Sequence, residues 1–221
     1  MTDTERRSVV RDSLGVGVAV GAYGFAFGAA SVSAGLSVLQ TCLLSLLAFT
    51  GGTQFAVVGV VSGGGSAGAA LAGGLLLGSR NTLYAMRLAP LLNVRGLRRL
   101  VAALGTIDES TAMAVAQPSA PLSRVAFWWT FGGVFSFWNL TTLLGAVAGS
   151  LVDPATVGLD AVVPAAFLAL LAPRLRNGVV ERRIAVVAAV IAFALIPLTP
   201  AGVPVLTACA ALLVAFRLGR P

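Results

Sequence analysis

The chain has 221 residues, of which 57% are hydrophobic and only 10% are charged, and its mean hydropathy is +0.94. These values exclude an ordinary water-soluble domain and predict an integral membrane protein. The formal net charge is +7, with fifteen arginines and neither lysine nor histidine. Most of the arginines lie in the connections between apolar runs, so they indicate membrane topology and no nucleic-acid partner. Without histidine, imidazole metal sites and most catalytic centres are excluded, and we expect no enzyme activity, cofactor or metal.

The apolar runs have the length of membrane-spanning helices. About 20 apolar residues cross a hydrocarbon core of roughly 30 Å, whereas the strands of a barrel would alternate apolar and polar side chains. The sequence therefore predicts an all-α membrane protein, a polytopic helical bundle of about six to seven segments. The candidate segments are 14–34, 37–61, 67–93, 124–151, 156–173, 184–199 and 202–216.

We expect one membrane domain over residues 1–221. It consists of a first helical group at 13–93, a cytoplasmic connection at 94–123 and a second helical group at 124–217. The connection begins with a candidate amphipathic helix at 94–104, which we expect on the membrane surface.

Arginine placement predicts the orientation, because cytoplasmic connections carry the excess of basic residues. The arginines of the long connection and those near the C-terminus share one side if the later segments all cross, and both termini are then expected in the cytoplasm of a multi-pass cell-membrane protein. Arg6, Arg7 and Arg11 conflict with this, since three complete crossings would place them outside. We therefore expect at least one broken or re-entrant segment in the first half, which requires shielding by protein or water. The alternative is an external N-terminus.

The first segment carries glycines on one helical face. Gly17, Gly21, Gly24 and Gly28 follow one another at steps of four, three and four residues. Such a face allows close approach of a neighbouring helix. The alternative is a signal peptide, because arginines precede the run and AASVSA resembles a cleavage region. The run is longer than the apolar core of a usual signal peptide, which favours a retained helix.

The second segment is interrupted at its middle by the string FTGGTQF. Adjacent glycines and a buried amide favour local unwinding, and transporters build midplane sites from interrupted helices because freed N–H and C=O groups bind the charged ends of a substrate. Gly51, Gly52, Thr53 and Gln54 are therefore candidate substrate-binding residues. The alternative is a tight helix crossing in which Gln54 bonds across helices.

The third segment contains two arginines in the string GSRNTLYAMR. An arginine near the centre of a membrane helix costs about 2.5 to 3.5 kcal/mol, so it needs a partner, a cavity or the interface. Arg87 can reach the interface, whereas Arg80 lies about 10 Å deeper. Helical spacing places Arg80, Asn81, Tyr84 and Arg87 on one polar stripe. The stripe fits a pathway in which Arg80 meets a carboxylate or an acidic gate residue, and it fits helix-to-helix hydrogen bonding equally well.

The connection 94–123 contains the adjacent carboxylates Asp108 and Glu109. Together with Arg87 they are candidate gating residues, through ion pairs that form and break during transport. The alternative for Glu109 is a capping box with Thr106 at the start of a short helix.

The fourth segment contains the string FWWTFGGVFSFWNL. Trp128 and Trp129 fit the headgroup level of an aromatic belt. Trp138 and Asn139 lie deeper and are candidate substrate-binding residues, with core packing as the alternative.

The order of these motifs resembles the AzlC family of branched-chain amino-acid exporters. The resemblance runs from Gly15 to Leu171 and rests on GAYGFAFG, FTGGTQF, GSRNTLYAMRLAP, GTIDEST and FWNLTTLLGAVAGSLVDPATVGLD. It implies export of leucine, isoleucine, valine and related apolar amino acids, together with a small membrane partner of the AzlD type. The residues that match the family's are Gln54, Arg80, Tyr84, Asp108, Glu109 and Trp138. Where the family usually has asparagine and, two residues later, arginine and histidine, this chain has Gly78, Arg80 and Asn81.

The sequence thus predicts a proton-coupled secondary transporter that exports small apolar amino acids. Its expected partners are membrane lipid, an AzlD-type subunit and the amino acid itself. Two alternatives stay open: a non-transporting membrane subunit that assembles with a partner, and an importer or channel for another small solute.

Overall fold

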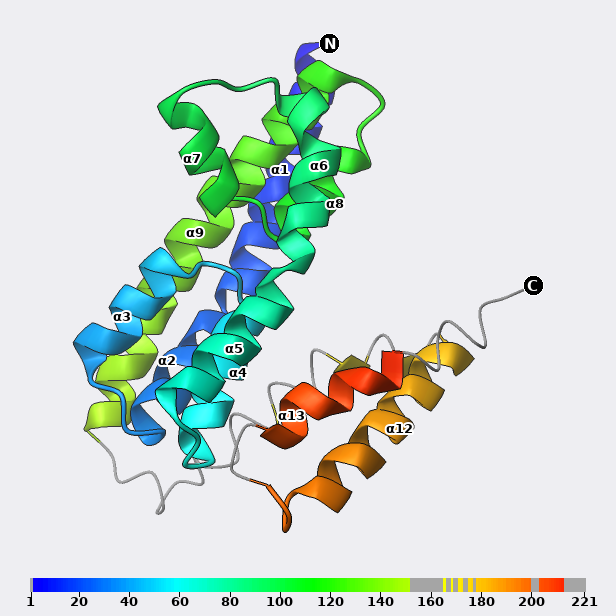
Figure 1. Cartoon of the computed structure of the whole chain (residues 1–221). Helices are drawn as coiled ribbons and strands as arrows, with labels where there is room; N and C mark the ends of the chain where they lie inside the picture. The colour runs from blue at the N-terminus through cyan, green and yellow to red at the C-terminus, as the bar shows by residue number, and fades with distance from the viewer. Residues whose placement is uncertain are drawn as a thin grey trace.

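The computed structural model describes residues 2–151, 178–199 and 203–212, together with residues 165, 168, 171, 172, 175 and 176. All regular secondary structure in these residues is helical, so the all-α prediction is confirmed for them (Figure 1). Two continuous stretches are long and apolar enough to cross a membrane, Asp3–Ser33 and Ala120–Ser150.

The helices are α1 (Asp3–Gly21), α2 (Tyr23–Ser33), α3 (Val38–Leu47), α4 (Gly52–Ser62), α5 (Ala67–Gly78), α6 (Arg80–Leu92), α7 (Leu97–Leu104), α8 (Asp108–Val115), α9 (Ala120–Ser150), α12 (Val179–Leu195) and α13 (Val203–Ala208), followed by the 3-10 helix η2 (Cys209–Ala211). Of the predicted segments, 156–173 lies mostly outside the described residues, as does the end of 202–216. Within the described part, α12 and α13 pack on each other, and α13 also contacts α5.

The long helix α9 is the centre of the main bundle. It contacts α1, α2, α3, α6 and α8, and Figure 1 shows it running beside α1 and α2 over most of its length. Its buried side includes Phe127, Phe131, Val134 and Trp138. Phe131, Val134 and Trp138 belong to the main apolar core, and Phe127 belongs to a second apolar cluster with Leu88 and Leu92.

Glycines form the seam between α1, α2 and α9. A Cβ on Gly17 would come within 2.9 Å of the backbone carbon of Gly133, and one on Gly28 would collide with the backbone of Thr142. From the other side, a Cβ on Gly145 would collide with the backbone of Phe25. The prediction that the glycine face of the first segment packs closely against another helix is therefore confirmed, and the partner is α9.

The second predicted segment, 37–61, forms two short helices that turn back on themselves. α3 has 10 residues and α4 has 11, so at 1.5 Å per residue each is about 15 Å long, half of a hydrocarbon core. Ser37 begins α3 with a capping box to Gln40. At the turn, Gly51 has φ +55°, a conformation that glycine adopts without strain. In Figure 1, α3 rises beside α9 and α4 returns beside α5, so the chain reverses direction while its two helices pack on different neighbours, and this pair is called the first hairpin.

A second hairpin, α7 and α8, enters from the opposite end of the bundle (Figure 1). Each helix has 8 residues, and the buried residues Gly105, Thr106 and Ile107 join them. A Cβ on Gly105 would meet the ring of Phe131, which shows how closely this tip approaches α9. The amphipathic helix expected at 94–104 thus exists as α7, but its end turns into the protein and does not lie along the surface.

The start of α8 differs from the expected capping box. The hydroxyl of Thr106 donates to the carbonyl of Ala102 at 2.7 Å, and the hydroxyl of Ser110 accepts from the N–H of Ile107 at 3.2 Å. The residue before the helix is therefore Ile107, so Glu109 lies in the first turn without capping Thr106.

The third predicted segment, 67–93, is divided at Ser79. α5 ends at Gly78 and α6 begins at Arg80, while the Ser79 hydroxyl donates to the carbonyl of Leu76 at 2.6 Å. The division places Arg80 in the first turn of α6, about midway along the bundle (Figure 1).

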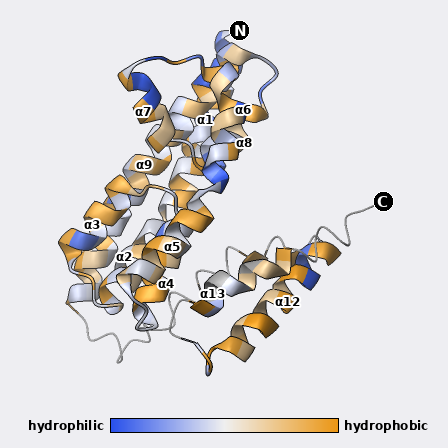
Figure 2. Cartoon of the chain, viewed as in Figure 1, coloured by the Kyte–Doolittle hydropathy of each residue, from blue (hydrophilic) through white to orange (hydrophobic). Residues whose placement is uncertain are grey.

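The outer surface of the bundle is apolar along its sides. Exposed large side chains include Leu39 and Leu47 on α3, Leu71 and Leu75 on α5, and Leu83 on α6. Figure 2 shows these helices mainly in the colours of hydrophobic residues, with polar residues gathered toward the N-terminal end. Such a surface is typical of contact with lipid.

The close helix contacts at the glycine seam predict that adding a side chain there lowers the stability of the fold. Gly28→Ala is expected to destabilise the protein by about 1 to 3 kcal/mol, because its Cβ would meet backbone that cannot rotate away. Gly15→Ala, in the same continuous stretch, has nothing within 4 Å of its Cβ and serves as the control. Thermal unfolding in detergent measures both variants. Equal midpoints for the two would contradict the seam.

Candidate functional site

A cavity of about 510 Å³ lies where the tips of the two hairpins approach the division between α5 and α6. It has a small polar part and a larger apolar part. The residues that line it are Val20, Tyr23, Phe49, Thr50, Gly51, Gly52, Phe55, Leu77, Arg80, Ile107, Asp108, Glu109, Val134, Trp138, Leu168 and Leu171.

The polar part is organised around the Arg80 guanidinium. Its Nη2 lies 2.7 Å from Oδ2 of Asp108, and the Tyr84 hydroxyl donates to Oδ1 of the same carboxylate at 2.6 Å. The side chains of Arg80 and Asp108 are 29% and 34% exposed, which is consistent with their facing the cavity. The two come from different elements, α6 and the tip of the second hairpin, so the ion pair joins these elements.

The start of α4 adds further positive potential at this place. The first N–H groups of a helix have no partner within the helix, and Gly51 has no side chain with which to cap them. A Cβ on Gly52 would lie 3.4 Å from Nη2 of Arg80, so the guanidinium approaches this helix terminus closely. A cation beside the positive end of a helix dipole is unfavourable unless an anion accompanies it. The geometry therefore calls for an anion here, and Asp108 supplies one.

Aromatic rings form the apolar part of the cavity. Phe55 and Trp138 meet edge to face with ring centroids 6.3 Å apart, and both contact Phe27 behind them, at 5.5 and 6.0 Å. The indole Nε1 of Trp138 is buried and has no hydrogen-bond partner among the described residues. Val134 and Ile107 complete a wall that suits an aliphatic group.

Glu109 also lines the cavity, next to Asp108 in the first turn of α8. Within the described part of the chain the only acidic partner that Arg80 has within 4 Å is Asp108. Glu109 thus contributes a second carboxylate that does not neutralise Arg80 directly.

The candidate residues predicted from sequence divide into two sets. Those that line the cavity are Gly51, Gly52, Arg80, Asp108, Glu109 and Trp138, and those that do not are Thr53, Gln54, Asn81, Tyr84, Arg87 and Asn139. The polar stripe on α6 is likewise divided, because Arg80 and Tyr84 both meet Asp108 whereas Arg87 is exposed and away from the cavity.

Gln54 and Asn139 make local contacts. The amide nitrogen of Gln54 donates to the carbonyls of Leu44 and Ser45 at 3.3 and 3.2 Å, which ties α4 to the end of α3. The amide nitrogen of Asn139 donates to the carbonyl of Phe135 at 2.8 Å on its own helix. Gln54 therefore holds the first hairpin in shape beside the cavity.

Sequence reasoning missed most of the apolar lining. Val20 and Val134 carry no sequence signal that separates them from other buried residues, because the cavity depends on where the hairpins end. Phe49 and Phe55 were within reach, since they open and close the motif FTGGTQF.

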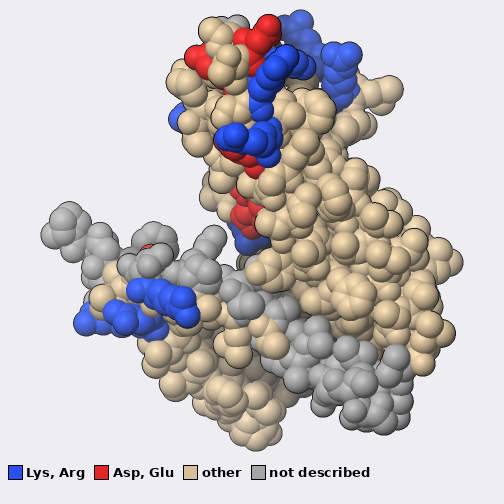
Figure 3. All heavy atoms as spheres, turned by 180° about the vertical axis from the view of Figure 1, so that it is seen from behind, with Lys and Arg blue, Asp and Glu red and all other residues tan. Residues whose placement is uncertain are grey.

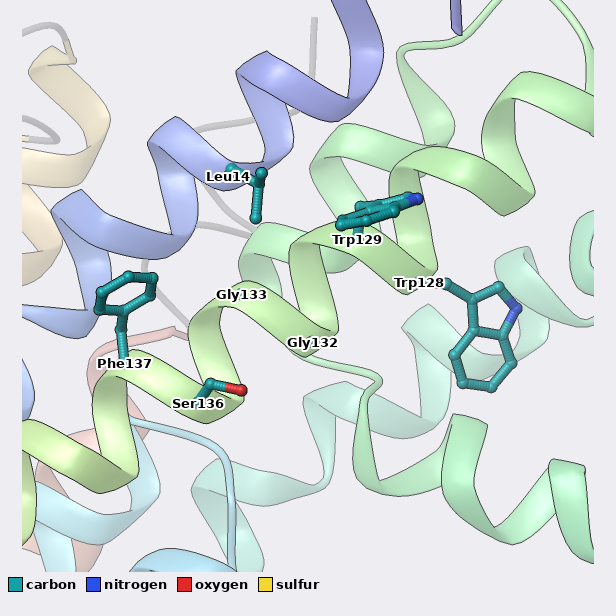
Figure 4. Close-up of a pocket in the computed structure, with 7 residues that line it drawn as sticks. All are labelled: Leu14, Trp128, Trp129, Gly132, Gly133, Ser136 and Phe137. Atoms are coloured by element: carbon teal, nitrogen blue, oxygen red, sulfur yellow. The ribbon is translucent and has the colours of Figure 1, made fainter. Parts of the chain in front are cut away.

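A second hollow of about 490 Å³ lies on the surface between α1 and α9 (Figure 4). Its lining residues are Leu14, Trp128, Trp129, Gly132, Gly133, Ser136 and Phe137. Among the described residues, those that line this hollow include no charged side chain.

The hydrogen bond from Tyr84 to Asp108 is expected to stabilise the fold, and this can be tested. Tyr84→Phe removes the hydrogen bond to Asp108 and is expected to cost about 1 kcal/mol, which corresponds to a lower thermal midpoint by about 2 to 4 °C. The control is Tyr23→Phe, because Tyr23 lines the cavity without a hydrogen bond from its hydroxyl to any described residue. Thermal unfolding in detergent compares the two, and an unchanged midpoint for Tyr84→Phe would show that this contact does not stabilise the fold.

Comparison with known proteins identifies the family. The family model described as AzlC protein matches residues 15–152, which contain the cavity lining from Val20 to Trp138. An uncharacterized membrane protein of Archaeoglobus fulgidus is 32% identical over 182 residues, covering 81% of this chain and 80% of that protein. The inner membrane protein YgaZ of Escherichia coli is 29% identical over 149 residues, covering 63% of this chain and 59% of that protein. No solved structure gives a significant match. The chain belongs to the AzlC family of membrane proteins.

Proposed function

We propose that the protein is a secondary transporter that exports branched-chain or similar small apolar amino acids across the cytoplasmic membrane. The observation that carries this proposal is the cavity itself, in which Arg80 and the start of α4 face an aromatic and aliphatic wall. An arginine within the membrane-spanning part of a protein is taken as functional by default, and its expected ligand here is an anion.

An amino acid with an apolar side chain matches both parts of the cavity. Its carboxylate fits Arg80 and the N–H groups of α4, its side chain fits the wall of Phe55, Val134 and Trp138, and Glu109 supplies a charge for its ammonium group. An apolar wall discriminates one methylene by about 1 to 3 kcal/mol, so leucine, isoleucine and valine are expected to share the site.

The two hairpins support alternating access. We propose that α3–α4 and α7–α8 are re-entrant, entering the membrane from opposite sides and ending at the cavity. Backbone of this kind is tolerated at membrane depth only where protein or a cavity shields it, which the buried tips satisfy. Interrupted helices around a midplane site are typical of secondary transporters.

Re-entrance also removes the conflict in arginine placement. If the first hairpin does not cross, α1–α2, α5–α6 and α9 are the three crossings of the main bundle, and the N-terminus and the connection around Arg95 share one side. Figure 3 shows basic side chains at that end of the bundle. The start of α1, the connection from α6 through α7, and the start of α9 contain Arg6, Arg7, Arg11, Arg95, Arg98, Arg99 and Arg124. We propose that this end, and with it the N-terminus, is cytoplasmic. A cytoplasmic C-terminus remains our expectation, since it lies outside the described residues.

Other parts of the proposal rest on the family resemblance. These are the outward direction, coupling to the proton gradient and a small AzlD-type subunit. Two functions compete with this proposal: a non-transporting subunit that assembles with a partner, and an importer or channel for another small solute. Flux measurements separate them from the exporter.

Transport is tested by reconstituting the protein in liposomes, with and without the small partner, and following labelled leucine. Arg80→Ala is expected to lower flux at least tenfold at equal protein levels, because the carboxylate loses its charged partner. Arg6→Ala is the control, since Arg6 is an exposed arginine near the N-terminal end of α1, away from the cavity-lining residue Val20 at the other end of that helix. Normal flux in Arg80→Ala would refute the assigned role, and no flux in any wild-type preparation would favour a non-transporting subunit.

The topology is tested by cysteine labelling in a background without Cys42 and Cys209. Arg6→Cys and Arg98→Cys are expected to react with an impermeant maleimide only after the membrane is opened, whereas Ala67→Cys should react in intact cells, because the start of α5 lies at the opposite end of the bundle. Labelling of Arg6→Cys and Arg98→Cys from opposite sides would contradict a re-entrant first hairpin.

A further inference from the structure

Asp108 occupies the place at which a solute carboxylate would neutralise Arg80. Among the described residues, Asp108 is the only acidic residue within 4 Å of that guanidinium, with Oδ2 at 2.7 Å from Nη2. Asp108 also lies in the first turn of α8, where the helix dipole stabilises a negative charge. In the absence of solute the protein therefore supplies the required anion from its own chain.

The contact with Asp108 leaves part of the hydrogen-bonding capacity of the Arg80 guanidinium unused. Nη2 of Arg80 contacts Asp108, while Nε is buried and has no hydrogen-bond partner among the described residues. A free carboxylate can take two parallel hydrogen bonds from the planar guanidinium, which is the stronger arrangement. The start of α4 lies close to Nη2 of Arg80, since a Cβ on Gly52 would be 3.4 Å from that nitrogen, and the first N–H groups of α4 have no side-chain cap.

We infer that Asp108 is an internal competitor that a solute carboxylate displaces from Arg80, an inference that rests on the proposed transport function. The solute must therefore be an apolar monocarboxylate with its carboxylate free. An amide or ester of the same carbon skeleton has no charge with which to replace Asp108, and it is rejected even though it fits the aromatic wall.

Displacement also changes the connection between the hairpin and the bundle. The Arg80–Asp108 pair joins α6 to the tip of α7–α8, and Tyr84 on α6 bonds the same carboxylate. When the solute takes Arg80, the tip loses its ionic contact with α6. Occupancy of the cavity thereby frees the hairpin that enters from the arginine-rich end.

The experiment measures binding to the purified full-length protein by calorimetry. The probes are 4-methylpentanoate, which is the leucine skeleton without its amine, and the isosteric 4-methylpentanamide. Asp108→Asn keeps the shape and the acceptor for Tyr84 but removes the competing charge, so it is expected to bind 4-methylpentanoate at least tenfold more tightly than the wild type. The amide is expected to bind neither protein.

Two further variants make the result specific. Asp12→Asn breaks the exposed ion pair between Arg11 and Asp12, which lies at 3.2 Å, and is expected to change binding less than twofold. Tyr84→Phe loosens Asp108 without removing its charge, so it should tighten binding by a smaller factor than Asp108→Asn.

Unchanged or weaker binding of 4-methylpentanoate by Asp108→Asn would overturn the inference, as would binding of the amide as tight as that of the acid. If Asp108→Asn does not fold, absence of any tightening in Tyr84→Phe overturns it. The proposed function fails by a separate observation, the lack of leucine flux through the wild-type protein.

Discussion

The arrangement of this protein depends on one electrostatic requirement, which is that two positive groups in an apolar bundle need a negative partner. The Arg80 guanidinium and the start of α4 lie side by side at the cavity. Asp108 meets this requirement from the opposite hairpin and is itself held by Tyr84. Because Asp108 belongs to a different element from Arg80, the ion pair that neutralises Arg80 is also a contact that holds the tip of α7–α8 against α6. A solute that alters the ion pair necessarily alters that contact.

The two hairpins serve this requirement by ending at the same depth. Helices of 8 to 11 residues are too short to cross a hydrocarbon core, and each pair turns back at a tip that lines the cavity. At each tip a helix begins or ends beside the cavity, so backbone groups without a helical partner face it. In a continuous helix that crosses the membrane, the same groups would be hydrogen-bonded within the helix. The division of α5 and α6 at Ser79 brings Arg80 to the same place.

The sequence alone predicted the features that depend on a local pattern of residues. The apolar runs gave the helical class, the glycine steps gave the close contact with α9, and the depth of Arg80 marked a residue that needs a partner. The double glycine at 51–52 and the arginine conflict at the N-terminus together indicated an interrupted segment. The pairing with Asp108 was only one of several possibilities, because it depends on how deeply α7–α8 enters. At the tip of that hairpin Gly105 packs against Phe131, a contact between distant residues that no local pattern encodes.

The glycine seam between α1, α2 and α9 has a consequence for motion. Where Gly17 meets Gly133 and Gly28 meets Thr142, backbone touches backbone, and few side-chain torsions are available through which the contact could re-form at a slightly different offset. Sliding these helices would break the contact without offering a second one, so they act as a fixed frame. Conformational changes are then confined to the short hairpins α3–α4 and α7–α8, which pack against α2 and α9 while α1, α2 and α9 keep their relative positions.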